Sequence, residues 1–223
     1  MRSSLTRGGL AALLAAALVA CSSGAQTAAQ QSAPAPSPAP GPASASSAPA
    51  HSAPLKANPA DAQFVTGMIS HHAQALIMAG WAPSHGASPA VATLAERIVA
   101  GQKDEIVTMQ NWLRDHGLPV PEAKPGPMTM TMNGMTHQMM MPGMLTDEQM
   151  KQLDAARGRE FDRLFLTFMI QHHKGAVTMV QDLFGTNGAA QEQSIYKMGS
   201  DVSADQTTEI ERMQRMLVPY TRQ

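Results

Sequence analysis

Cysteine is almost absent from this chain of 223 residues, since Cys21 is the only one. A single sulfur cannot form an internal disulfide, and it cannot supply the thiolate clusters that are typical of structural zinc sites. Positive charge is not in excess either, because 16 Lys and Arg stand against 17 Asp and Glu. With few aromatic residues and no basic stripe, the sequence argues against nucleic acid as a partner.

Long apolar runs are also missing. The one run near the start, over residues 10–20, is too short to cross a bilayer of roughly 30 Å as a helix. It follows two arginines and ends in Leu-Val-Ala-Cys, which resembles a bacterial lipobox. We therefore predict a signal peptide over residues 1–20 and a lipidated Cys21. The protein would be exported and held at a membrane by the lipid, facing the periplasm or the cell exterior. An ordinary signal peptide followed by an unmodified Cys is the alternative.

The next segment is rich in Ala, Pro, Ser and Gln and has almost no large apolar side chain. Such a stretch cannot bury enough surface to offset the entropy lost on ordering. We expect residues 21–57 to be a disordered tether that begins at the lipidated Cys. The folded domain is then expected over residues 58–218.

Start and stop signals predict helices in that domain. Asn58 and Ser88 are each followed by Pro, which is the pattern of an N-cap and first helical residue. Gly117 is a typical C-cap residue and Thr146 opens a capping-box pattern. Gly158 is expected to kink or divide the third helical stretch. The predicted helices span residues 59–81, 89–116, 146–185 and 189–218. No strand-like alternation stands out, so the predicted fold class is all-α.

An internal repeat indicates how the helices pair. Residues of the first and third helices match at an offset of 101, and residues of the second and fourth match at an offset of 104. The first set is Asp61, Phe64, Met68, Ile69, His71, His72, Ala75 and Met78, matching Asp162, Phe165, Met169, Ile170, His172, His173, Ala176 and Met179. The second set is Gln102, Glu105, Ile106, Met109 and Leu113, matching Gln206, Glu209, Ile210, Met213 and Leu217. We expect a four-helix bundle of two duplicated hairpins, residues 58–116 and 146–218, related by a pseudo-twofold axis.

Methionine is enriched, with 18 in the chain. Eight lie in the segment that joins the hairpins, residues 117–145, together with one histidine. These are Met128, Met130, Met132, Met135, His137, Met139, Met140, Met141 and Met144. A connecting loop has no core to fill, so packing does not explain its methionines.

The repeated helix places Met68 three residues before His71 and four before His72. Either pair can share one ion, because such positions are neighbours on a helix. Adjacent histidines point about 100° apart, so they should serve two different sites, or one should bind and the other orient. The duplicated helix can supply the missing ligands across the axis. The alternative is that the helical methionines and histidines are packed, hydrogen-bonded core residues.

Ligand softness indicates the metal. Thioethers select Cu(I), and imidazole suits Cu(II) or zinc; a mixed set can hold copper in both states, and Ag(I) should bind the methionines. We predict copper as the bound ion. The candidate ligands are Met68, His71, His72, Met78, Met169, His172, His173 and Met179, with the eight methionines and His137 of the connecting segment.

No catalytic constellation is evident, so we do not expect an enzyme. Ferritin-like di-iron sites use Glu-x-x-His motifs, and none occurs here. The repeat-related Glu105 and Glu209 are expected to hydrogen-bond along the helices or to lie on a solvated face. The predicted role is copper buffering, tolerance or transfer, with other copper-handling proteins as possible partners. A ferritin-like redox metalloenzyme and a metal-free envelope interaction protein are the alternatives.

The run from Gly158 to Met179 is similar to the signature of the bacterial domain of unknown function 305 family, and the resemblance covers residues 59–218. It implies a ferritin-like four-helix fold, and copper binding through Met and His as in CopM-like periplasmic proteins. The motif implies the same Met and His ligands in both copies. Among the positions at which the first copy departs from the second, Gly67, Ser70 and Gln74 stand in place of Phe168, Gln171 and Gly175.

Overall fold

The computed structural model describes residues 57–132 and 135–221, and at residues 129–132, 136 and 137 it describes the backbone only. These residues belong to one compact unit. The predicted signal peptide, Cys21 and the tether lie outside the described residues and stay predictions. Among the helices of the described ranges, none combines the length and the apolar character that a membrane crossing requires.

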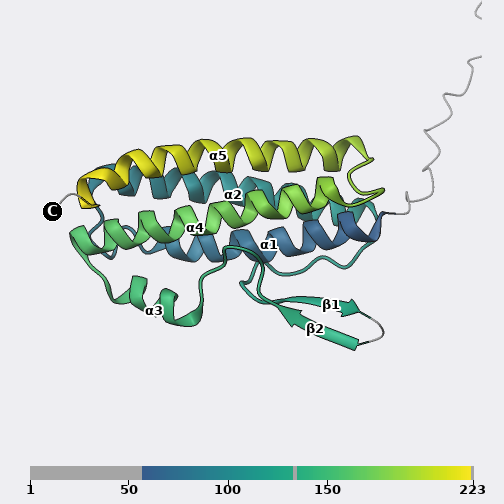
Figure 1. Ribbon diagram of the computed structural model, residues 1–223, viewed down its shortest axis with the longest axis horizontal. Coiled ribbons are helices and arrows are strands. Elements are labelled where there is room, and N and C mark those ends of the chain that lie inside the picture. The colour runs from purple at the N-terminus through teal and green to yellow at the C-terminus, as the bar shows by residue number, and fades with distance from the viewer. Residues whose placement is uncertain (1–56, 133–134, 222–223) are drawn as a thin grey trace, which may run out of the picture. The chain divides into compact units, whose positions relative to one another are not determined.

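Four long helices form a bundle of two antiparallel hairpins (Figure 1). They are α1 (Pro59–Gly80), α2 (Pro89–Asp115), α4 (Gly158–Gly185) and α5 (Gln193–Thr221). Helix α1 packs along α2, α4 packs along α5, and the hairpins meet mainly where α1 contacts α4. The predicted all-α bundle of two hairpins is confirmed.

The helix ends follow the local signals in most places. The Asn58 side chain accepts a hydrogen bond from the Ala60 N–H, and Thr146 forms the full capping box with Gln149. The predicted third helical stretch is divided at Gly158, as the sequence allowed, because the chain forms α3 (Asp147–Ala155) and then turns before α4. Gly158 has φ +56°, which favours glycine, and its N–H donates to the His85 carbonyl at 2.8 Å.

The fourth helix also differs from its predicted bounds, since it begins at Gln193 and continues through Pro219 to Thr221. A proline in the last turn interrupts few intrahelical hydrogen bonds, and the packing of the neighbouring Tyr220 maintains the helix. The Tyr220 hydroxyl donates to the Asp162 carboxylate at 2.7 Å.

Two buried aspartates connect the hairpins by equivalent hydrogen bonds, each to the turn of the opposite hairpin. Asp61 on α1 accepts a 2.7 Å hydrogen bond from the N–H of Ala190, in the turn between α4 and α5. Its repeat partner Asp162 on α4 accepts from the N–H of Ser88, in the turn between α1 and α2, at 3.1 Å. Because each carboxylate satisfies a backbone donor of the opposite turn, the pseudo-twofold relation inferred from the sequence is built into the hairpin junction.

The segment between the hairpins contains two strands that the sequence analysis missed. Strand β1 (Met128–Met132) pairs antiparallel with β2 (Met135–Met139), and Met130 is opposite His137. The alternation of Met and Thr along β1 has the period of two that is typical of a strand.

After β2 the chain returns to the bundle and packs on it. Met141 and Met144 are 3% and 7% exposed and belong to the same apolar cluster as Met68. The expectation that the methionines of this segment have no core to fill is therefore wrong for Met141 and Met144.

The returning segment crosses the junction between α1 and α4, and a glycine makes room for it there. A Cβ atom on Gly175 would overlap the Pro142 carbonyl and lie 2.6 Å from the Cα of Gly143. On α1, across the junction from Gly175, the Gln74 side chain accepts a hydrogen bond from the Leu145 N–H at 2.7 Å and donates one to the Leu145 carbonyl at 3.0 Å.

Two further differences between the copies, at Gln171 and at Gly67, lie at the same junction. Gln171 donates to the Gly143 carbonyl at 3.3 Å. The space beside Gly67 is occupied by the ends of Met128, Met141 and Met179. These differences are thus explained by one asymmetric feature, the segment that packs over the junction.

Substituting Gly175→Ala tests this packing. We expect the free energy of unfolding to fall by about 1–3 kcal/mol, the usual cost of forcing a methyl group into a filled space. The matched control is Gly101→Ala on α2, where nothing lies within 4 Å of the added Cβ. That change should raise stability by about 0.5–1 kcal/mol, because glycine is unfavourable in a helix interior. Urea unfolding measures both, and equal effects of the two substitutions would contradict the packing described.

Candidate metal centre

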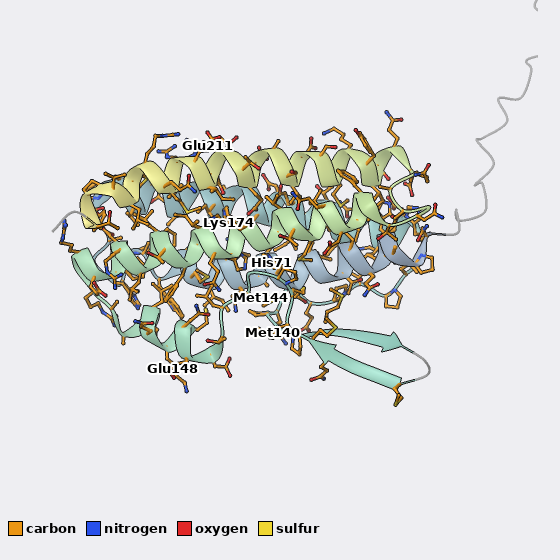
Figure 2. All side chains as sticks on the ribbon, in the orientation of Figure 1. His71, Met140, Met144, Glu148, Lys174 and Glu211 are labelled. Carbon is orange, nitrogen blue, oxygen red and sulfur yellow. The ribbon has the colours of Figure 1, made fainter. Side chains whose placement is uncertain are left out.

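The two His-His pairs lie in the interior of the bundle, and all four imidazoles are fully buried. His71 projects from the middle of α1 (Figure 2) and meets His172 of α4, with ring centroids 3.8 Å apart. Each adjacent pair diverges, since the rings of His71 and His72 are 6.4 Å apart and those of His172 and His173 are 6.2 Å apart. The duplicated helices therefore bring one histidine of each pair together across the junction, as the sequence indicated.

Three of these histidines each have one ring nitrogen in a hydrogen bond to an oxygen. His71 Nε2 is 2.9 Å from the Pro142 carbonyl. His72 Nε2 is 2.6 Å from Glu105 Oε2, and His173 Nε2 is 2.7 Å from Glu209 Oε2. Carbonyl and carboxylate oxygens only accept, so Nε2 carries the hydrogen and donates it. In the neutral ring, Nδ1 is then left with a free lone pair.

The remaining nitrogens have no hydrogen-bond partner. They are Nδ1 of His71, His72 and His173 and both nitrogens of His172. A buried acceptor without a partner loses its hydration and gains nothing in return, which costs roughly 1–3 kcal/mol.

Two other described histidines provide a comparison within the same molecule. His85 is bonded through Nδ1 to Ser84 and through Nε2 to Asp154. His116 is bonded through Nδ1 to the Trp112 carbonyl and through Nε2 to Glu192. Both are nearly as buried in their side chains, yet both nitrogens of each are occupied. The four histidines of the repeat thus have the spare lone pairs that a metal ion requires.

Burial also keeps His71, His172 and His173 neutral. Desolvation, followed by the charge on His72, lowers the pKa of His71 from 6.5 to about 3. Desolvation lowers the pKa of His172 far below its usual value, and it lowers that of His173 although Glu209 acts in the opposite direction. Neutral imidazole is the form that binds metals. Glu105 and Glu209 form hydrogen bonds, which was one of the two expectations for them, and their partners are histidines of the neighbouring helix.

A cavity of about 340 Å³ lies beside this histidine cluster and is rich in methionine. Its lining residues are Ala60, Gln63, Phe64, Met128, Met139, Met140, Met141, Pro142, Met179, Asp182, Leu183 and Thr186. Met139 and Met140 are 51% and 53% exposed, so they connect the cavity to solvent. Pro142 lines the cavity and also accepts the hydrogen bond from His71, which makes the two regions adjacent.

The other candidate ligands are distributed differently. Met68, Met78 and Met169 are fully buried in apolar clusters, where packing accounts for them. Met135 is exposed at the end of the β-hairpin, and Met144 lies in the core. The side chains of Met130, Met132 and His137 lie outside the described part of the structure. Within the described ranges, no three side chains of His, Cys, Asp or Glu are placed to share one ion.

Sequence reasoning missed the partners that the connecting segment brings to this centre. The Pro142 carbonyl orients His71, and Asp182 and Gln63 line the methionine cavity. Gln63 Nε2 also lies 3.4 Å from the Met128 sulfur. No local signal marks a backbone carbonyl as a histidine acceptor. The recurrence of a His on the first helix and a Glu on the second helix of both hairpins, however, could have indicated the two His–Glu pairs.

The metal-free protein should lose stability on mild acidification. His71 binds a proton below about pH 6.5 in the unfolded chain but only near pH 3 in the folded one. The unfolded state therefore takes up more protons as the pH falls through this window, and the fold is weakened. For His71 alone the loss between pH 7 and pH 5 is on the order of 2 kcal/mol. Urea unfolding at the two pH values measures it; a stability that does not change would contradict the burial of neutral rings.

Comparison with known proteins places the chain in a family. The family model described as domain of unknown function (DUF305) matches residues 61–217. A DUF305 fragment from Deinococcus radiodurans is 25% identical, with a TM-score of 0.60, over 74% of this chain and 99% of the fragment. A DUF305 protein from Streptomyces coelicolor, named as secreted, is 30% identical, with a TM-score of 0.60, over 72% of this chain and 93% of its own.

CopM is also similar. Its Cu(I)-bound form is 27% identical to this chain, with a TM-score of 0.55, over 73% of this chain and 98% of CopM. CopM has been solved in Cu(II)-bound and Ag-bound forms as well. No protein with a curated description matches. The family model covers well over half of the residues and includes both hairpins, so this chain belongs to the DUF305 family.

Proposed function

We propose that this protein binds copper in the interior of its helical bundle, through the histidines of the repeat and the methionines beside them. The observation that carries the proposal is the set of ring nitrogens without hydrogen-bond partners on four buried imidazoles. The hydrogen bonds from Nε2 to Glu105, Glu209 and Pro142 are of the kind that orient metal-binding histidines in proteins. The similarity to CopM, which has been solved with Cu(I), Cu(II) and Ag, supports the choice of metal.

The two kinds of ligand suit different oxidation states of copper. The histidine cluster suits Cu(II) as well as Cu(I), because imidazole binds both. The methionine cavity offers only thioethers, one carboxylate and neutral groups, so it suits the soft ions Cu(I) and Ag(I). The exposed Met139 and Met140 would capture the ion, and Pro142 connects this cavity to His71.

The role we propose is buffering or transfer of copper, not turnover of a substrate. Export agrees with the secreted relative from Streptomyces coelicolor, and the lipid anchor at Cys21 is part of the same proposal.

Substitutions in the two regions should separate the two oxidation states. His172→Leu removes two unpartnered nitrogens, so we expect it to weaken Cu(II) binding at least tenfold while the apo protein keeps its stability. Met139→Leu with Met140→Leu should weaken Cu(I) and Ag(I) binding and leave Cu(II) binding almost unchanged. Equilibrium dialysis measures Cu(II), and competition with a Cu(I) chelator measures Cu(I).

Matched controls use residues of the same types outside the proposed sites. His116→Gln changes a histidine whose nitrogens are both bonded, and Met150→Leu with Met216→Leu changes two methionines that do not line the cavity. Copper binding should be close to that of the unmodified chain in both controls. Unchanged Cu(II) affinity in His172→Leu, or no retention of copper by the unmodified protein at micromolar free metal, would refute the proposal.

The anchor is tested separately with Cys21→Ser. In a bacterial host the unmodified chain should sediment with membranes and the variant should appear in the soluble exported fraction. Equal partition of the two chains would contradict lipidation at Cys21.

A further inference from the structure

Gly67 lies in the middle of α1, where its backbone conformation does not require glycine. The residue is helical and buried, and glycine in a helix interior is unfavourable. At the equivalent position of the second copy stands Phe168, whose ring is 8% exposed. A buried mid-helix glycine that the related helix replaces with a large ring usually has a packing or functional reason.

Three methionine side chains from separate parts of the chain meet in the space that Gly67 leaves. Measured from the position that a Cβ on residue 67 would take, Met128 Cε lies at 2.9 Å, Met141 Sδ at 3.3 Å and Met179 Cε at 3.4 Å. Met128 begins β1, Met141 follows β2, and Met179 lies on α4. Since Cε of methionine is bonded directly to the sulfur, three thioethers surround one point beside α1.

These three methionines also line the methionine cavity, and they differ in burial from the other two that line it. Met141 and Met179 are buried and Met128 is partly buried, whereas Met139 and Met140 are exposed. The thioethers beside Gly67 therefore lie on the inner side of the cavity, and those of Met139 and Met140 lie towards solvent.

Two polar groups of the cavity suit a singly charged soft ion. Gln63 Nε2 donates to the Met128 sulfur at 3.4 Å, which orients this thioether and leaves its second lone pair available. Among the lining residues that the structure describes, Asp182 is the only charged one. One carboxylate balances a single positive charge, whereas a divalent ion would keep an uncompensated charge at a largely apolar site.

We propose that Met128, Met141 and Met179 form a three-thioether site for Cu(I) or Ag(I) in the space beside Gly67. The proposal rests on the proposed function, because it specifies which methionines of the cavity hold the soft ion. Thioether sulfur selects such ions. Methionine is unbranched and flexible, so each sulfur can turn towards the point where the three side chains meet. Met139 and Met140 are then the residues through which the ion enters.

Nuclear magnetic resonance of the full chain with ¹³C-labelled methionine methyl groups tests the site, first without metal and then with Ag(I). We expect Ag(I) to shift the methyl resonances of Met128, Met141 and Met179. The resonances of Met109 and Met213 should stay in place, because these side chains are fully buried and do not line the cavity.

Substitutions test the same ligands by calorimetric titration with Ag(I). Met141→Leu and Met179→Leu should each weaken binding at least tenfold, and each by more than Met139→Leu with Met140→Leu. Leucine nearly conserves the volume of methionine, so the fold is retained. The matched control is Met213→Leu, which changes a buried methionine outside the cavity and should bind Ag(I) like the unmodified chain.

Gly67→Ala tests the site without removing a sulfur. The added methyl group would displace the end of Met128, so we expect Ag(I) binding to weaken severalfold while Cu(II) binding is unchanged. Alanine favours a helix over glycine, so loss of the fold would not explain a weaker affinity. Gly80→Ala on the same helix is the control, since nothing lies within 4 Å of its added Cβ.

The proposal is overturned if Ag(I) shifts only the methyl groups of Met139 and Met140, or if Met141→Leu binds Ag(I) as tightly as Met213→Leu. The proposed function would survive either result, because soft ions would still bind in the methionine cavity. An unmodified chain that binds neither Ag(I) nor Cu(II) would overturn both.

Discussion

The hydrogen bonds from buried imidazole Nε2 atoms to fixed oxygens are the interaction on which the rest of this structure depends. Each bond determines which nitrogen carries the hydrogen, and each leaves Nδ1 unpaired in a dry interior. A protein selected for stability alone would be expected to fill these positions with apolar side chains. The bundle instead keeps four polar rings at its centre. A metal ion that binds their unpartnered nitrogens would explain this.

The internal repeat and one break in its symmetry together shape the centre. The repeat supplies two equivalent histidine pairs and two equivalent glutamates. The segment between the hairpins then packs on one side of the α1–α4 junction, where Gly175 admits its backbone and Gln74 binds it. Through Pro142 this segment orients His71, and through its methionines it forms a cavity beside the histidines. The two sides of the α1–α4 junction thus differ in chemistry although the helices are related by the repeat.

Much of this architecture could be predicted from the sequence, because helix caps and a repeat are local or periodic signals. Asn58 and Thr146 begin helices as predicted, and the offsets of 101 and 104 gave the hairpin pairing. The strands were not predicted, although the alternation of Met and Thr in β1 is a local signal for them. The burial of Met141 and Met144 was not predicted because it depends on the connecting segment packing on distant helices. The close approach at Gly175 depends on residues distant in sequence, and one sequence shows no sign of it.

The most direct test of the central claim is ¹H–¹⁵N correlation spectroscopy of the histidine rings, first in the metal-free protein and then with Ag(I), which is diamagnetic. The account predicts that His71 and His173 are neutral at pH 7, and that His71, His72 and His173 all carry a hydrogen on Nε2. It also predicts that Ag(I) shifts Nδ1 resonances of this cluster and leaves those of His85 and His116 in place. Rings that are protonated on Nδ1, or Ag(I) shifts confined to His85 and His116, would contradict it.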